Sequence, residues 1–304
     1  MLKSPKNLGV IHFIGIGGIG MSGIAEILFQ SGYNVQGSDI SNSNNTIRLR
    51  KIGIKIFIGQ KKSNIINAKI IVVSTAISEI NKEYIAAKKM FLPIVHRAEM
   101  LGELMRLKQS IAIAGTHGKT TTTSLIAKMI EENGMDPTII NGGIISSLDS
   151  NAKLGNGEWM VVEADESDGS FAKLNPTVAI ITNIDLEHLD YHKSEENLEK
   201  AFFQFVSSIP FYGFVCLCID HPRTQKLISK LQNKKVITYG LSANADIRAT
   251  NISYKNNKMF FSLNISNLKD HNSKNYEIEF SMIGLHNIQN ALATIAIGIE
   301  LNIP

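Results

Sequence analysis

Short apolar runs alternate with longer segments of helical spacing along the first hundred residues. The apolar runs predict strands at residues 10–14, 34–37, 69–74 and 92–95. The helical spacing predicts helices at residues 18–31, 81–89 and 96–107. The asparagine-rich segment 41–45 is predicted to be a loop. Alternation of this kind predicts a parallel sheet with helices on its faces.

A second pattern of the same kind begins after the polar segment 106–110, which we interpret as a linker. Apolar runs predict strands at residues 111–114, 159–164, 178–182 and 214–219. Helical spacing predicts helices at residues 119–133, 195–206 and 284–301. Residues 245–282 alternate between apolar and polar positions, which predicts antiparallel strands. The expected fold class is α/β, with one domain at 1–107 and a second at 108–304.

The composition agrees with two folded domains. The chain has 304 residues, of which 44% are hydrophobic and 19% charged, enough for a sizeable core in each domain. These values exclude a disordered tail, a collagen and a disulfide-rich scaffold. The formal net charge of +4 is scattered along the chain, so we predict no nucleic-acid-binding surface.

Cysteine usage and hydropathy predict a soluble protein of the cytoplasm. Cys216 and Cys218 lie two positions apart on one predicted strand and point the same way, which is a poor geometry for a disulfide. We interpret them as small buried hydrophobic residues. No apolar run reaches the length of a membrane span, about 18 residues. The glycines that interrupt the first apolar stretch argue against a signal peptide.

A glycine-rich turn joins the first predicted strand to the first predicted helix. Gly15, Gly17 and Gly20 match the pattern G-x-G-x-x-G, in which glycines allow a tight turn and a close approach of the backbone to a phosphate. The helix that follows offers free N–H groups to an anion. Asp39 follows the second strand at the distance expected for a ribose contact. A dinucleotide or a nucleotide sugar fits this pattern better than a packing turn without a ligand, and NAD is one choice.

A second loop, residues 115–121, joins a strand to a helix in the second domain. Its sequence Gly-Thr-His-Gly-Lys-Thr-Thr holds the Gly-Lys-Thr of a phosphate-binding loop. Lys119 is expected to meet the β- and γ-phosphates, and the Thr120 hydroxyl to bind Mg²⁺. The loop is a variant, because its first glycine is Gly115 and the usual position is occupied by Ile113. A nucleotide fold together with a phosphate loop suggests an enzyme that uses ATP to activate a nucleotide-bearing substrate.

Polar residues follow the next predicted strands. Four acids, among them Glu163, Glu166 and Asp168, come directly after one strand, and such a cluster needs a nearby cation. Glu163, at the strand end, is the best candidate ligand for Mg²⁺. Asn183 and His188 follow the next strand and are expected to be functional. At the start of the last helix, Asn287 and Asn290 share a face, which fits either a helix cap or a ligand contact.

Together these motifs resemble those of the Mur ligase family, and specifically its alanine-adding branch. The motifs run in family order over the whole chain: 15–23, His-Arg-Ala-Glu-Met-Leu at 96–101, 115–121, Glu-Ala-Asp-Glu-Ser-Asp at 163–168, Asn-Ile-Asp-Leu-Glu-His-Leu-Asp at 183–190, and His-Asn-Ile-Gln-Asn at 286–290. The resemblance implies a Rossmann-like UDP-sugar-binding domain at 1–107. It also implies a phosphate-loop ATP-binding domain with an extra antiparallel sheet at 108–304. A third domain, which binds the amino acid in the family, is expected to be absent beyond Pro304.

The resemblance further implies an activity and the residues that carry it. ATP would phosphorylate the carboxylate of UDP-N-acetylmuramate, and L-alanine would attack the acyl phosphate. The ATP-binding residues would be Gly115, Thr116, His117, Gly118, Lys119, Thr120, Thr121, Asn183, His286, Asn287 and Asn290. Lys119, Glu163 and His188 would be catalytic, and Thr120, Glu163 and His188 would hold Mg²⁺. The UDP-sugar-binding residues would be Gly15, Gly17, Gly18, Gly20, Met21, Ser22, Asp39, Ser74 and Thr75.

Two departures from the family pattern shape what we expect. Several sister ligases carry a carbamylated lysine about fifteen positions after the histidine. Phe203 stands there in this chain with Lys200 nearby, so we predict no lysine carbamate. Without a third domain the chain is expected to be a truncated ligase that binds nucleotides but forms little product.

Three other interpretations remain open. Within the family, a ligase that attaches a recycled peptide to UDP-N-acetylmuramate shares the loop 115–121. The chain could also be a non-catalytic nucleotide-binding remnant. A third interpretation is a Rossmann dehydrogenase, which binding of reduced nicotinamide to residues 1–107 would support.

Overall fold

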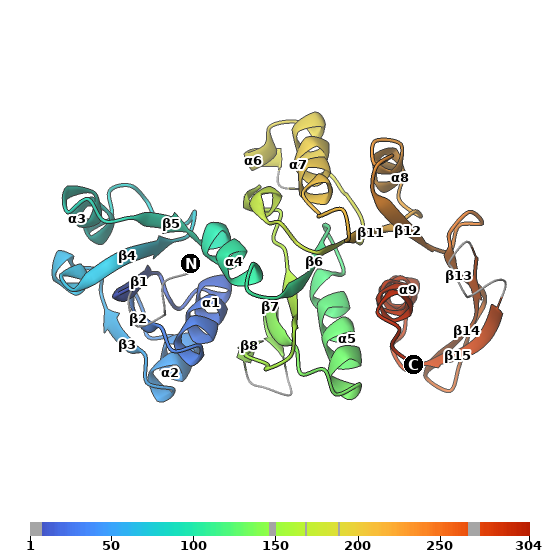
Figure 1. The fold of residues 1–304 in the computed structure, drawn as a ribbon, viewed down its shortest axis with the longest axis horizontal. Coiled ribbons are helices and arrows are strands. Elements are labelled where there is room, and N and C mark those ends of the chain that lie inside the picture. The colour runs from blue at the N-terminus through green and yellow to red at the C-terminus, as the bar shows by residue number, and fades with distance from the viewer. Residues whose placement is uncertain (1–7, 146–149, 168, 188, 267–273) are drawn as a thin grey trace. The chain divides into compact units, whose positions relative to one another are not determined.

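The chain folds into two compact units in a computed structural model that describes residues 8–145, 150–167, 169–187, 189–266 and 274–304. The first unit holds residues 1–107 and 138–156, and the second holds 108–137 and 157–304. In each unit strands and helices alternate along the chain, which confirms the α/β class (Figure 1).

The first unit is built on a parallel sheet with the strand order β3-β2-β1-β4-β5. Its strands are β1 (Val10–Ile14), β2 (Asn34–Asp39), β3 (Lys55–Ile58), β4 (Ala68–Val73) and β5 (Ile94–His96). The elements between and after them are α1 (Ile19–Gln30), α2 (Asn44–Lys51), the 3₁₀ turn η2 (Lys62–Ile65), α3 (Lys82–Lys89) and α4 (Arg97–Met105). The loops after β1, β2 and β4 therefore lie at one edge of the sheet, because these strands are parallel neighbours.

The prediction of a loop over residues 41–45 is wrong at its C-terminal end. Helix α2 begins at Asn44, and Ser43 caps it. The Ser43 hydroxyl accepts the Thr46 N–H, and the Thr46 side chain accepts the Ser43 N–H, which forms a capping box. Asparagine has a low helix propensity, so the start of this helix is indicated by the cap and not by the asparagines themselves.

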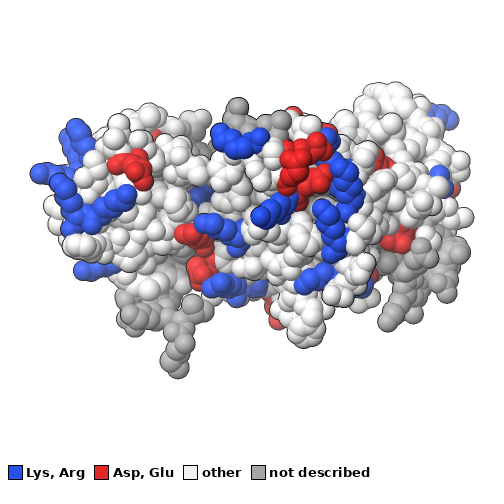
Figure 2. Space-filling view, turned by 90° about the horizontal axis from the view of Figure 1, so that it is seen from above, with Lys and Arg blue, Asp and Glu red and all other residues white. Residues whose placement is uncertain are grey.

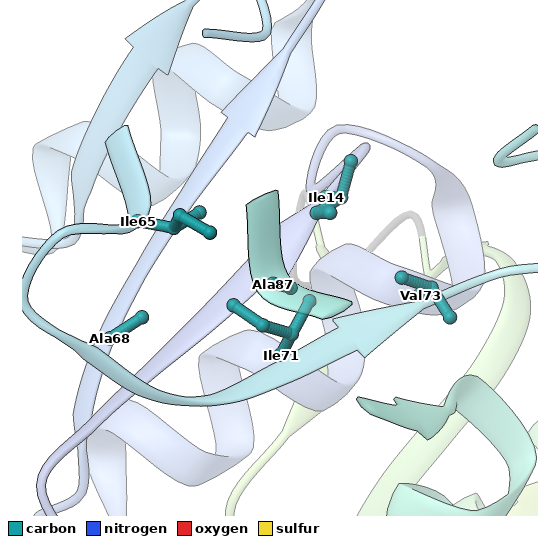
Figure 3. Packing of buried hydrophobic residues seen from close by; sticks show 6 residues of the cluster. All are labelled: Ile14, Ile65, Ala68, Ile71, Val73 and Ala87. Atoms are coloured by element: carbon teal, nitrogen blue, oxygen red, sulfur yellow. The ribbon is translucent and has the colours of Figure 1, made fainter. Parts of the chain in front are cut away.

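An apolar cluster fixes η2 and α3 against the sheet (Figure 3). Its members Ile14, Ile65, Ala68, Ile71, Val73 and Ala87 are at most 2% exposed. They come from β1, β4, η2 and α3, so one apolar cluster joins the 3₁₀ turn and α3 to these two neighbouring strands.

A buried polar network lies in the same unit. Glu83 of α3 accepts hydrogen bonds from Ser38 Oγ at 2.5 Å, Asn64 Nδ2 at 2.6 Å and His12 Nε2 at 3.2 Å. Gln36 Nε2 donates to His12 Nδ1 at 3.1 Å and so holds the ring from its other side. Burial disfavours the charged carboxylate, but the hydrogen bonds from His12, Ser38 and Asn64 outweigh it and lower the pKa of Glu83.

The hairpin of β7 (Thr138–Ile145) and β8 (Ser150–Lys153) packs against α1. Asn151 Nδ2 donates to the Ile19 carbonyl at the start of α1, at 2.5 Å. Ser150 Oγ donates to Glu26 at 3.0 Å, and Arg48 forms an ion pair with the same carboxylate. Polar side chains of the hairpin thus hold the helix that follows the glycine-rich turn.

The second unit contains the larger sheet, whose strands run in the order β15-β14-β13-β12-β11-β10-β6-β9. Their bounds are β6 (Gln109–Ala114), β9 (Trp159–Glu163), β10 (Val178–Ile181), β11 (Phe214–Cys218), β12 (Lys235–Gly240), β13 (Ile247–Lys255), β14 (Lys258–Ile265) and β15 (Lys274–Phe280). The helical elements are α5 (Lys119–Glu132), η3 (Ser170–Lys173), α6 (Leu189–His192), α7 (Glu195–Ser207), α8 (Pro222–Ile228) and α9 (Leu285–Glu300). Strands β9, β6, β10 and β11 are parallel neighbours, so the residues after them share one edge of the sheet.

The predicted antiparallel strands are confirmed as β13 to β15, and they extend the parallel sheet through a parallel pairing of β12 with β13. Cys216 and Cys218 are free and buried. In the described part of the chain, no helix is long and apolar enough to cross a bilayer. Basic and acidic side chains are intermixed on the face that Figure 2 shows, as the scattered charges of the sequence predict.

Candidate functional site

The glycine-rich loop, residues 15–18, connects β1 to α1 in a conformation that needs its glycines. Gly15 has a φ of +78°, and its N–H donates to the Ser38 carbonyl at 2.8 Å. The Gly17 N–H donates to Asp39 Oδ2 at 2.8 Å, and Asn45 Nδ2 donates to the Gly17 carbonyl at 2.8 Å. Asp39, the predicted ribose contact, therefore also holds the loop in place.

Helix α1 begins at this loop without a side-chain cap, so its first N–H groups are available to an anion. Met21 and Ser22 are only 2% and 0% exposed, and the Ser22 N–H donates to the Gly18 carbonyl at 2.8 Å, so these two predicted contacts are buried in this structure. A methyl group built on Gly20 would lie 2.7 Å from Arg97 Nη1, so the guanidinium packs against the first turn of the helix. Arg97 thus adds a cation to the predicted anion site.

Ser74 and Thr75, the remaining predicted UDP-sugar contacts, directly follow β4. Because β4 is the parallel neighbour of β1, they lie at the same sheet edge as the glycine-rich loop. Ser74 is half-buried and Thr75 is exposed. The Ser74 carbonyl accepts the Ile77 N–H at 3.1 Å, which turns the chain after the strand.

The phosphate loop, residues 115–121, connects β6 to α5 in the second unit. Gly115 has a φ of +135°, and a methyl group there would lie 2.1 Å from Thr182 Oγ1. Gly118 has a φ of +83°, and a methyl group there would lie 2.7 Å from Asn290 Oδ1. Both positions exclude a side chain, because the residues after β10 and at the start of α9 approach the loop backbone closely.

Asn183 and Thr182, which follow β10, brace the phosphate loop. Asn183 Oδ1 accepts the His117 N–H at 2.8 Å, and its Nδ2 donates to the His117 carbonyl at 3.0 Å. Thr182 Oγ1 donates to the same carbonyl at 2.6 Å. The Thr116 hydroxyl accepts the Asp185 N–H at 2.8 Å. The strand end therefore sets the loop conformation.

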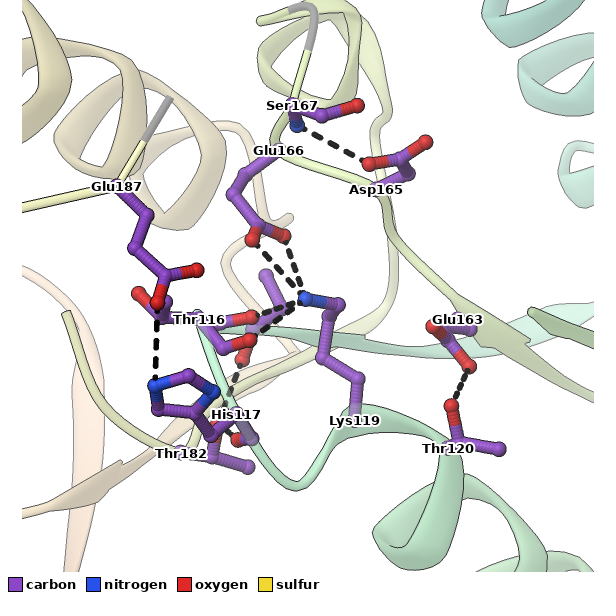
Figure 4. A network of polar contacts seen from close by, with 12 residues as sticks. Thr116, His117, Lys119, Thr120, Glu163, Asp165, Glu166, Ser167, Thr182 and Glu187 are labelled. Atoms are coloured by element: carbon purple, nitrogen blue, oxygen red, sulfur yellow. Dashed lines mark hydrogen bonds and ion pairs between the residues drawn. The ribbon is translucent and has the colours of Figure 1, made fainter. Parts of the chain in front are cut away.

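Lys119 Nζ lies inside the phosphate loop (Figure 4). It donates to the carbonyls of Gly115 at 2.6 Å and Thr116 at 3.1 Å. It also forms an ion pair with Glu166, whose two carboxylate oxygens both lie 2.9 Å away. Glu166 is 2% exposed. Burial raises the pKa of the Glu166 carboxyl, although Lys119 pulls in the opposite direction.

A hydroxyl and a carboxylate face each other beside this lysine. Thr120 Oγ1 donates to Glu163 Oε2 at 2.8 Å, from the first turn of α5 to the end of β9 (Figure 4). Both are hard oxygen donors, and Mg²⁺ is commonly held by one or two such protein ligands together with phosphates and water. The two residues fit a magnesium ion. The described residues contain no group of three or more metal-ligating side chains. The third predicted ligand, His188, and Asp168 of the predicted acidic cluster lie outside the described residues.

Histidines and acids form a second polar group at the same edge. His117 Nε2 lies 3.5 Å from Glu187 Oε1 and 3.7 Å from Asp185 Oδ2. His221, at the N-cap position of α8, has its Nε2 2.9 Å from the other oxygen of Asp185. His117, a predicted ATP residue within the phosphate loop, is largely exposed and lies close to these two carboxylates.

The start of α9 meets the phosphate loop through Asn290. Its Oδ1 accepts the Thr122 hydroxyl at 3.1 Å, and its Nδ2 donates to Asn287 Oδ1 at 3.3 Å. Asn287 Nδ2 donates to the Ile283 carbonyl at 2.8 Å and holds the turn before the helix. His286 is exposed and folds back over Gly284.

The structure adds residues that the sequence patterns left out. Arg97 and Asn45 join the glycine-rich loop, and Thr182 joins the phosphate loop. Glu166 belonged to the predicted acidic cluster but had no role of its own. Arg97 belongs to the family motif at 96–101, so the sequence could have indicated it. Asn45 and Thr182 act on backbone groups far away in the sequence, which no local pattern indicates.

Two α/β units, one with a glycine-rich loop and one with a phosphate loop at the carboxyl ends of parallel strands, are the arrangement typical of nucleotide-binding enzymes. A model of the Mur ligase middle domain matches residues 113–298, and one of the Mur ligase family catalytic domain matches residues 10–109. The chain belongs to the Mur ligase family.

Curated relatives are identical to this chain at about half of the aligned positions. The UDP-N-acetylmuramate–L-alanine ligase of Acidiphilium cryptum is 54% identical over 100% of this chain, and that of Rhodospirillum rubrum is 53% identical over 100%. The chain spans 64% and 63% of these two proteins.

Solved structures show the same fold. The UDP-N-acetylmuramate-alanine ligase of Thermotoga maritima superimposes with a TM-score of 0.83 at 30% identity, covering 97% of this chain and 65% of that one. The UDP-N-acetylmuramate:L-alanyl-gamma-D-glutamyl-meso-diaminopimelate ligase of Neisseria meningitides gives a TM-score of 0.86 at 24% identity, covering 97% and 94%.

Proposed function

We propose that the chain is the nucleotide-binding part of an ATP-dependent ligase that joins L-alanine to the carboxylate of UDP-N-acetylmuramate, in the synthesis of peptidoglycan precursors in the cytoplasm. The observation that carries the proposal is the phosphate loop, with Lys119 inside it and Thr120 facing Glu163 at the next strand end. The names of relatives that are more than 50% identical supply the substrates.

The reaction needs ATP and the nucleotide sugar at separate places. A carboxylate oxygen of the sugar attacks the γ-phosphorus, ADP leaves, and an acyl phosphate forms. The amine nitrogen of L-alanine then attacks the acyl carbon, inorganic phosphate leaves, and the nitrogen loses a proton to give the amide. Phosphoryl transfer gains most from positioning and from cations near the phosphates.

The residues of the second unit suit the ATP half of this reaction. The phosphate loop would bind the phosphates through its N–H groups, and Lys119 would neutralise charge on the β- and γ-phosphates. Thr120 and Glu163 would hold Mg²⁺, which would stabilise negative charge on the phosphates. His188 stays a predicted third ligand. Asn183 would act by keeping the loop in its binding conformation.

The residues of the first unit suit a diphosphate. The uncapped start of α1 and the nearby guanidinium of Arg97 would bind the two phosphates of UDP. Asp39 would keep its bond from the Gly17 N–H, which positions the loop, and accept a ribose hydroxyl with the remaining lone pairs of its carboxylate. Ser74 and Thr75 would contact the ligand from the neighbouring strand end.

A trapping experiment tests the proposal. The purified chain is incubated with ATP, magnesium, UDP-N-acetylmuramate and hydroxylamine, and the hydroxamate of the sugar is sought by mass spectrometry. We expect a hydroxamate that requires ATP and is lost in Lys119→Met. Failure to detect it in a folded sample that binds both nucleotides would contradict carboxylate activation by this chain.

The fold alone does not separate the alanine ligase from the peptide-adding ligase, because structures named for each match with TM-scores of 0.83 and 0.86. We favour L-alanine because the relatives that are more than 50% identical carry that name.

A further inference from the structure

The ammonium group of Lys119 has no donor to spare in this structure. It carries three N–H groups, and three acceptors surround it: the carbonyls of Gly115 and Thr116 and the carboxylate of Glu166. A phosphate oxygen can be reached only if one of these acceptors is given up. Two of the acceptors are neutral carbonyls of the phosphate loop itself. The Glu166 carboxylate is the charged acceptor, so it competes with a phosphate for the Lys119 ammonium group.

Hydrogen bonds to its backbone hold Glu166 in this position. Its backbone carbonyl accepts the Gly169 N–H at 3.1 Å and pairs with His192 Nε2 at 3.0 Å. His192 is 6% exposed, and its own carbonyl accepts Asn197 Nδ2 at 2.9 Å. The segment that presents the carboxylate is therefore fixed from α6 and α7, and the side chain points into the phosphate loop (Figure 4).

We propose that Glu166 is a positioning residue that holds Lys119 in the nucleotide-free protein and competes with the β- and γ-phosphates for it. The inference rests on the proposed ATP site. Glu166 is almost completely buried, and breaking a buried ion pair leaves an uncompensated charge. Binding of a triphosphate must supply that free energy, so Glu166 weakens the affinity for ATP while keeping the empty loop ordered.

The competition makes a prediction that depends on the phosphates of the ligand. In Glu166→Gln the amide oxygen still accepts a hydrogen bond, but its charge is gone and the lysine is free to turn to the nucleotide. We expect the Kd for ATP with magnesium, measured by titration calorimetry, to fall about tenfold. The Kd for AMP, which has neither a β- nor a γ-phosphate, is expected to stay within twofold.

Two further variants serve as controls. Glu199→Gln removes the same charge from an ion pair with Lys226 in the same unit, and we expect unchanged affinities for both nucleotides. Glu166→Asp withdraws the carboxylate by one methylene and keeps the charge, and we expect a smaller gain for ATP in the same direction. It also supplies the test if Glu166→Gln fails to fold.

The outcomes separate this inference from the proposed function. Tighter binding of ATP alone in the Glu166 variants supports the competition. If the wild type binds ATP and the folded variants bind it equally or more weakly, the inference is overturned but the ATP site is not. The same holds if the variants gain as much affinity for AMP as for ATP. A folded wild-type chain that does not bind ATP overturns both.

Discussion

The bidentate contact between Asn183 and His117 allows a quantitative prediction for the phosphate loop. Asn183→Ala removes two hydrogen bonds, of 2.8 and 3.0 Å, from the loop backbone. Each contributes about 1 kcal/mol, so the loop loses up to about 2 kcal/mol of support. If ATP has to restore the loop conformation, that free energy is taken from binding and corresponds to about 30-fold in Kd.

The value of 30-fold is an upper bound, because Thr182 still donates to the His117 carbonyl. We therefore expect the Kd for ATP with magnesium to rise by about threefold to 30-fold in titration calorimetry. Inorganic triphosphate should lose affinity by the same factor, since the effect acts through the phosphates. Binding of UDP-N-acetylmuramate should not change. Asn175→Ala, which removes a single exposed contact of 3.4 Å, is the matched control.

Two results would refute this reasoning. An Asn183→Ala variant that melts like the wild type and binds ATP equally well would show that the loop does not depend on Asn183. A variant that loses affinity for ATP but not for inorganic triphosphate would show that Asn183 contacts the adenosine part directly.

Three further predictions concern stability and reactivity. Because the pKa of Glu83 is lowered in the folded chain, its contribution to stability is present above the pKa of the unfolded chain, about 4.3, and is lost as the pH falls through the folded pKa. Unfolding free energies of the wild type and Glu83→Gln should therefore converge in acid; a constant gap would contradict this. Gly37→Ala should destabilise the first unit by about 1–3 kcal/mol in urea unfolding, because its methyl group would lie 2.6 Å from Ile16 Cδ1. Gly32→Ala has open space around its methyl group but a φ of +89°, so it should cost about 1 kcal/mol in the same assay. Burial raises the pKa of Cys218 to about 12, so iodoacetamide at pH 8 should label it only after denaturation; labelling of the native protein would contradict its burial.

Strands such as β1 and β6 and the glycine-containing loops that follow them could be predicted from sequence, because their signals are local, whereas β3 and β12 were not predicted. β1 is an apolar run that ends at Gly15, and β6 is another that ends at Gly115. The start of α2 was missed because its signal is the side-chain bonding between Ser43 and Thr46, which competes with the loop preference of the asparagines between them.

The roles of individual site residues could be predicted less well, because they depend on partners far away in the sequence. Asn183 holds backbone atoms of His117, 66 positions earlier, and Glu166 meets Lys119 at a separation of 47. Such pairs follow from the strand order β9-β6-β10, which no local pattern specifies. The position of the β7–β8 hairpin against α1 could not be predicted for the same reason, since Asn151 is bonded to Ile19.

The central claim is that the chain holds two nucleotide sites, each on its own loop. Titration calorimetry of the wild type and Lys119→Met with ATP and magnesium, and then with UDP-N-acetylmuramate, tests it most directly. We predict one site for each ligand in the wild type, and a variant that loses ATP binding and keeps the nucleotide sugar with unchanged Kd. Equal loss of both ligands in a folded variant, or ATP binding that does not depend on Lys119, would contradict the claim.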